Sequence, residues 1–92
     1  NQIAYLGRIA QLTDSVRSTD FITVTWDAVT GATGYNIYVN GGLHTAAPNT
    51  TTTLKITGLE SNTWYTISVR VKYDINGTDA FSFDTTINSQ TD

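Results

Sequence analysis

Apolar and polar residues alternate along most of the chain, and this alternation predicts a series of short β-strands. Within residues 21–26, every second residue shares one face with Trp26, because successive side chains of a strand point to opposite sides of its sheet. A longer run that starts at Thr63 places apolar residues at every odd position from Tyr65 to Val71. Both segments are therefore predicted to be strands that bury one face.

Turn signals divide the chain between these runs. Asn40-Gly41 and Asn76-Gly77 are typical of tight hairpins, because both residues adopt a positive φ at low cost. Pro48 lacks a backbone N–H and is expected to end strand pairing where it stands. The predicted strands cover residues 9–16, 21–26, 34–39, 43–46, 51–57, a run from Thr63, and 80–87.

Seven short strands separated by turns at intervals of about 8 to 12 residues predict an all-β, seven-stranded antiparallel sandwich. A single sheet would leave its apolar face in water, so a second sheet is expected to cover it. The inward positions give the expected core: Leu12, Ile22, Val24, Trp26, Tyr35, Ile37, Leu54, Ile56, Leu59, Tyr65, Ile67, Val69, Val71, Phe81 and Phe83.

Composition narrows the class of protein. The 92 residues fit one compact domain, and 18 threonines among apolar residues favour strands over helices. A net charge of -3 with five Lys plus Arg argues against binding to nucleic acid or to an anionic membrane, and no segment has the length of a membrane span. The chain has no Cys, so packing alone must stabilise it; it also has no Met, as expected for a piece of a longer protein.

The ends of the chain lack the alternation of its centre. Residues 1–8 are expected to be an N-terminal extension or linker, although Ile3, Tyr5 and Leu6 could pack against the end of the domain. Residues 9–88 are expected to form the folded domain, and residues 89–92 a C-terminal linker.

The stretch from Leu12 to Ile87 resembles the fibronectin type III family. Trp26 ends one strand, and Tyr35 opens the segment Gly-Tyr-Asn-Ile-Tyr-Val, as in that family's second and third strands. Leu59 and Tyr65, six residues apart, resemble the family's corner motif, although Ser61 stands where the family often has Pro. The proline usual near the start of the first strand is also missing.

This resemblance implies an immunoglobulin-like sandwich in which the Tyr65 hydroxyl ties the preceding loop to its strand. It also implies a non-catalytic module. The turn 74–79 occupies the position where receptor-binding members carry Arg-Gly-Asp, and this tripeptide is missing from the sequence. Recognition of integrin-type receptors by that route is therefore not expected.

Candidate catalytic and metal-binding groups are few. His44 is the single histidine and the chain has no Cys, so neither a metal site nor a catalytic triad is expected around it. The side-chain oxygens of residues 74–79 are of the type that coordinates calcium. However, the glycine does not stand where a calcium-binding loop has it, and the Glu that serves such a loop as a bidentate ligand is missing. Asp27 and Glu60 show no pairing as acid and base. We therefore expect no enzyme activity, no cofactor and no metal.

Three aromatic residues remain on polar strand faces, namely Phe21, Tyr38 and Trp64. Pairing of neighbouring strands would bring Tyr38 and Trp64 to one outer face near Arg70, provided that strand twist allows it. These three residues are the candidate contact site for a carbohydrate, a partner protein or a neighbouring domain. In the alternative interpretation, Trp64 folds over the adjacent loop and shields the edge of the core.

The sequence thus predicts a spacer or interaction module of a larger extracellular, secreted or virion-surface protein, with phage tail proteins and secreted bacterial polysaccharide hydrolases as the expected settings. Flanking domains are its expected partners, and the isolated domain is expected to be a monomer. A carbohydrate- or protein-binding module that uses Trp64 and Tyr38 is the alternative function. Asn49-Thr50-Thr51 and Asn76-Gly77-Thr78 match the loose pattern for N-glycosylation.

Overall fold

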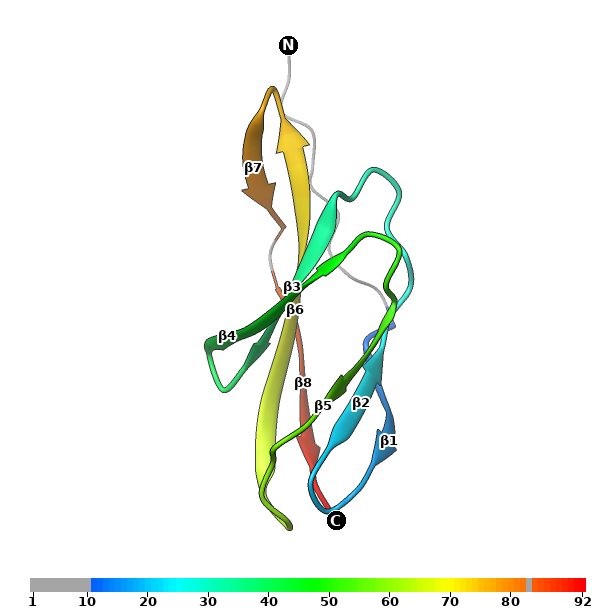
Figure 1. Cartoon of the computed structure of the whole chain (residues 1–92), viewed down its shortest axis with the longest axis vertical. Coiled ribbons are helices and arrows are strands. Elements are labelled where there is room, and N and C mark those ends of the chain that lie inside the picture. The colour runs from blue at the N-terminus through cyan, green and yellow to red at the C-terminus, as the bar shows by residue number, and fades with distance from the viewer. Residues whose placement is uncertain (1–10, 83) are drawn as a thin grey trace.

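The computed structural model describes residues 11–82 and 84–92, and every regular element in them is a β-strand. Two antiparallel sheets face each other (Figure 1). Their strands are β1 (Thr13–Arg17), β2 (Ile22–Thr25), β3 (Gly34–Val39), β4 (Gly42–Pro48), β5 (Thr53–Ile56), β6 (Trp64–Ile75), β7 (Thr78–Phe81) and β8 (Thr85–Gln90). The predicted all-β antiparallel sandwich is confirmed. The described residues contain no helix with the length and hydropathy of a membrane span.

The smaller sheet has the order β1-β2-β5, and the larger has β4-β3-β6, with β7 and β8 both paired to β6. β6 is the longest strand, with 12 residues, and it pairs with β3, β7 and β8. Its far end pairs with β7 in a hairpin that projects beyond the sandwich (Figure 1). The described chain is therefore elongated, with extents of 49 × 20 × 17 Å.

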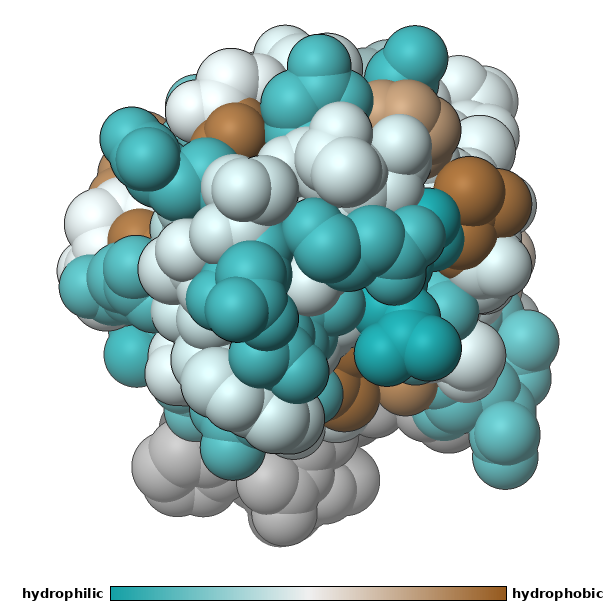
Figure 2. Space-filling model, turned by 90° about the horizontal axis from the view of Figure 1, so that it is seen from below, coloured by the Kyte–Doolittle hydropathy of each residue, from teal (hydrophilic) through white to brown (hydrophobic). Residues whose placement is uncertain are grey.

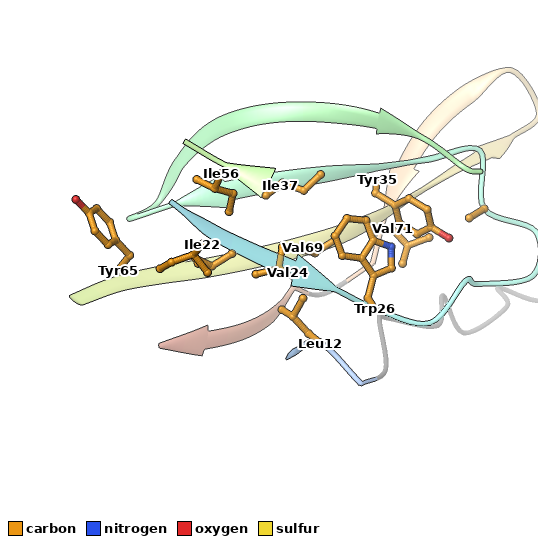
Figure 3. Packing of buried hydrophobic residues seen from close by; sticks show 12 residues of the cluster. Leu12, Ile22, Val24, Trp26, Tyr35, Ile37, Ile56, Tyr65, Val69 and Val71 are labelled. Carbon is orange, nitrogen blue, oxygen red and sulfur yellow. The ribbon is translucent and has the colours of Figure 1, made fainter. Parts of the chain in front are cut away.

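The core forms where the alternating faces of the two sheets meet. Trp26, which follows β2, packs edge-on against Tyr35 of β3, with 5.5 Å between ring centroids and an interplanar angle of 63° (Figure 3). Both side chains are buried, as are the isoleucines and valines around them. The Tyr35 hydroxyl accepts a hydrogen bond from the backbone N–H of Val29 at 3.0 Å. The buried Trp26 indole N–H has no hydrogen-bond partner among the described residues.

Most of the expected core residues are buried. Leu54 and Leu59 are half-buried and pack against the main cluster. Phe81 was expected inside, but it is 40% exposed, and this expectation is wrong. Phe83, also expected in the core, lies outside the described residues.

The position of Phe81 follows from a break in the last predicted strand. Instead of one strand over residues 80–87, β7 ends at Phe81 and β8 begins at Thr85, which gives eight strands rather than seven. Between them, buried Ser82 exchanges two hydrogen bonds of 3.0 Å with the backbone of Val71. Ser82 therefore takes the inward position, and Phe81 pairs with Lys72 on the outward side.

Both Asn-Gly turns form as predicted. Asn40 and Asn76 have φ values of 51° and 54°, and the glycines that follow them have values of 86° and 84°. Two successive residues with positive φ match the twist of the flanking strands, which favours tight hairpins. β4 runs to Pro48, the residue expected to end pairing.

The C-terminal end of the domain differs from the expected linker. β1 begins at Thr13, and residues 1–8, expected to be an extension, lie outside the described residues. Residues 89–92 are not a free linker: β8 continues to Gln90, and Ser89 and Thr91 are buried. The Thr91 hydroxyl donates to the carbonyl of Glu60 at 2.6 Å, so the C-terminal segment is bonded to the domain.

Candidate functional site

The solvent-facing side of the larger sheet carries the predicted contact residues. We call it the outer face; it comprises the even-numbered residues of β6 from Trp64 to Arg70 together with their partners on β3 and β8. Tyr38 pairs with Ser68, and Ser68 pairs with Thr86. Directly opposed residues of antiparallel strands point to the same side, so these side chains share one surface.

Tyr38 and Arg70 contact each other on the outer face. The Arg70 guanidinium lies 5.6 Å from the centroid of the Tyr38 ring, within the range of a cation–π interaction. The Asn36 amide donates to the Tyr38 hydroxyl at 3.4 Å. These contacts hold the phenol ring against the sheet, and the ring remains half-buried.

A hollow of about 260 Å³ opens beside this pair. We call it the central hollow; its lining residues are Tyr38, Gly41, Ser68, Arg70 and Asp84. Sequence reasoning missed Ser68 and Asp84. Asp84 immediately precedes Thr85, which pairs with Val69 at the start of β8. The register between β6 and β8 therefore places Asp84 beside Arg70, and the sequence alone does not give this register.

Trp64 stands apart from this hollow. It opens β6 and is 63% exposed, so it does not cover the edge of the core as in the alternative interpretation. Trp64 lies four residues before Ser68, the partner of Tyr38. Four residues of a strand span about 13 Å, so the two rings share a face without stacking on each other.

Hydroxyl and amide side chains fill the surface between the two rings. The Ser68 and Thr86 hydroxyls lie 2.9 Å apart, and the Thr66 hydroxyl donates to the Asn88 side-chain oxygen at 3.0 Å. Each of these pairs spans β6 and β8. The outer face is therefore a ladder of polar pairs whose side chains hold one another in place.

The remaining chemical candidates do not converge. His44 is exposed on β4, and Asp27 and Glu60 are exposed in loops. The acids of residues 74–79 are exposed along the β6–β7 hairpin, where Asp79 lies 3.6 Å from Lys72. Over residues 11–82 and 84–92, no group of three His, Cys, Asp or Glu side chains is arranged to hold a metal ion.

The two glycosylation patterns differ in their surroundings. The Asn49 side-chain nitrogen donates one of its two hydrogens to the Ala32 carbonyl at 3.0 Å. Asn76 is exposed at the tip of the β6–β7 hairpin.

Comparison with known proteins connects this geometry to a family. The model of the fibronectin type III domain matches residues 9–88. Chitinase D of Niallia circulans is 41% identical over 66 residues, which cover 68% of this chain and 12% of that enzyme. The tail tube protein gp17.1* of Bacillus phage SPP1 is 42% identical over 52 residues, which cover 56% of this chain and 20% of that protein.

A solved structure shows the same fold. The central fibronectin-III array of RIM-binding protein superposes with a TM-score of 0.80 at 24% identity, covering 95% of this chain and 33% of that one. The chain thus spans a fifth or less of the curated relatives described above. Since the family model covers most of the chain and the sandwich has the matching architecture, the chain belongs to the fibronectin type III domain family.

Proposed function

We propose that this domain is a non-catalytic spacer that sets the distance and orientation of neighbouring domains in a larger secreted or virion-surface protein. The observation that carries this proposal is the range of its relatives. A similar segment forms a minor part of a chitinase and of a phage tail tube protein. Two such different proteins share the fold rather than a reaction, as expected of an accessory module.

The shape and the interior of the domain support this role. Its longest dimension, which includes the projecting β6–β7 hairpin, is 49 Å and the other two are 20 and 17 Å, so the domain is an elongated body rather than a sphere. Its interior is filled by apolar side chains from both sheets. A packed interior resists deformation, which lets the module transmit a fixed geometry.

The test replaces the domain within its parent protein. A Gly/Ser linker of 92 residues has a root-mean-square end-to-end distance of about 50 Å, close to the length of the domain but without its rigidity. We expect this linker to impair the activity or the assembly of the parent, and an unrelated rigid β-sandwich of similar length to restore it. Full function with the flexible linker would contradict the proposal, as would failure of the rigid replacement.

We further infer that the isolated domain is a monomer whose contacts are made to flanking domains. Within the part of the chain that the structure describes, the exposed large apolar residues are distributed over β1, β4, β6 and β7 rather than gathered in one patch. At the end that carries the C terminus, hydrophobic residues lie scattered among hydrophilic ones (Figure 2). Sedimentation equilibrium is expected to give the mass of one chain, 10.0 kDa, whereas a concentration-dependent dimer would contradict this inference.

A further inference from the structure

The central hollow combines opposite charges with an aromatic ring. Arg70 supplies N–H donors, Asp84 supplies carboxylate acceptors, and both line the same hollow as Tyr38. Neither Arg70 nor Asp84 belongs to the ion pairs found in the described residues, which join Arg17 to Asp14 and Lys72 to Asp79. The hollow therefore offers donors and acceptors together while adding no net charge.

A ligand suited to this hollow carries groups that both donate and accept hydrogen bonds and is itself neutral. Hydroxyl groups have this property, and a sugar ring adds an apolar C–H face that can lie against a phenol ring. The volume of about 260 Å³ lies just below the range of about 300–1,000 Å³ typical of pockets for small molecules. A single sugar ring is therefore better matched to it than a larger compact ligand.

The surface beyond the hollow continues the same chemistry. The Ser68–Thr86 and Thr66–Asn88 pairs lead along β6 toward Trp64. A protein partner would be expected to meet an interface centre rich in apolar side chains, but this stretch is polar. Because its side chains already bond to one another, they lose little conformational freedom when a ligand binds.

Trp64 provides a second aromatic ring, and its distance from Tyr38 suits a ligand made of several linked sugars. About 13 Å of strand separates it from the pairing position of Tyr38. This span exceeds a single sugar ring, so one ligand can reach both aromatic residues only if it is an oligomer. We propose that the outer face binds a neutral oligosaccharide along β6, with one sugar ring in the central hollow and another stacked on Trp64.

This binding role is additional to the spacer role and can fail without affecting it. The test is NMR titration of the 92-residue chain with cellohexaose and chitohexaose, and with hexagalacturonic acid as the charged comparison. We expect at least one neutral hexaose to shift backbone amides of β6 and β8 near Ser68 and Thr86. We expect hexagalacturonic acid to bind more weakly, because the hollow adds no net charge and the chain as a whole carries a net charge of -3, which repels carboxylates.

Variants assign the binding to the outer face. Trp64→Ala is expected to weaken binding about tenfold, equivalent to about 1.4 kcal/mol, and Asp84→Ala is expected to weaken it as well. Trp64→Phe keeps a stacking ring and should retain most of the affinity. Val16→Ala serves as the matched control, because Val16 is an exposed apolar residue on the smaller sheet and should not affect binding.

Several results would overturn the proposal. The proposal fails if neither neutral hexaose shifts the spectrum, or if Trp64→Ala binds as tightly as the original chain while its spectrum shows an intact fold. Preferred binding of hexagalacturonic acid would overturn the neutral class of ligand. Shifts of the outer-face amides on joining a flanking domain, without any response to sugars, would show that a protein occupies this surface instead.

Discussion

The Tyr65 hydroxyl accepts a hydrogen bond of 2.8 Å from the backbone N–H of Glu60, five residues earlier in the chain. Tyr65 is buried near the start of β6, and Glu60 lies in the loop that connects β5 to β6. One side chain thus anchors the core and also ties down the loop that crosses between the sheets. The Leu59–Tyr65 spacing predicted this corner, and the corner forms even though Ser61 replaces the usual proline.

Replacing Tyr65 with Phe should destabilise the domain by about 1–2 kcal/mol, because the Glu60 N–H loses its partner. Chemical denaturation gives the free energy of unfolding. Tyr35→Phe should have a similar effect, since the Tyr35 hydroxyl accepts from the Val29 N–H. Tyr38→Phe is the control, because among the described residues the Tyr38 hydroxyl has only the 3.4 Å contact with Asn36. An unchanged midpoint for Tyr65→Phe would remove the corner from the account.

Ser82→Ala should destabilise the domain by about 1–3 kcal/mol, because it leaves the backbone N–H of Val71 buried without its hydroxyl partner. Hydrogen exchange should show faster exchange of the Val71 amide. Ser68→Ala is the matched control on the exposed side of β6 and should change stability by less than about 0.5 kcal/mol. Equal effects of the two substitutions would contradict the role assigned to Ser82 at the strand break.

Gly34→Ala should destabilise the domain by about 1–3 kcal/mol, as is usual when atoms are forced into a packed site. A Cβ at Gly34 would lie 2.9 Å from the Ala47 carbonyl oxygen of the neighbouring strand β4. Gly42→Ala is the control, because the nearest atom to its Cβ would be 3.8 Å away. Thermal unfolding of both variants tests the close approach of β3 and β4; wild-type stability of Gly34→Ala would show that the strands separate easily.

Local patterns sufficed to predict the sheets and most of the core. The alternation in β2 and β6 depends only on each strand having one buried face, and the Asn-Gly turns depend on the two residues themselves. The exposure of Phe81 could not be predicted in this way. It depends on Ser82 bonding to Val71, a contact between residues 11 apart that alternation does not reveal.

The candidate site was predicted only in part, because it too depends on contacts between strands. Shared faces placed Tyr38, Trp64 and Arg70 on one surface, and Arg70 does contact Tyr38. The separation of Trp64 from Tyr38, and the presence of Asp84 beside Arg70, depend on which residues pair across three strands. The register among three strands is set by the complete sheet rather than by the sequence of any one strand.

The central structural claim is that the two sheets close over Trp26 while Trp64 stays in solvent, and single-tryptophan fluorescence tests it directly. The chain has two Trp residues, which are 4% and 63% exposed. In Trp64→Phe, emission from Trp26 should be blue-shifted and resist acrylamide quenching until the domain unfolds. In Trp26→Phe, Trp64 should emit and be quenched as a solvated indole. Solvent-like emission and ready quenching of Trp26 in the folded Trp64→Phe domain would contradict the account.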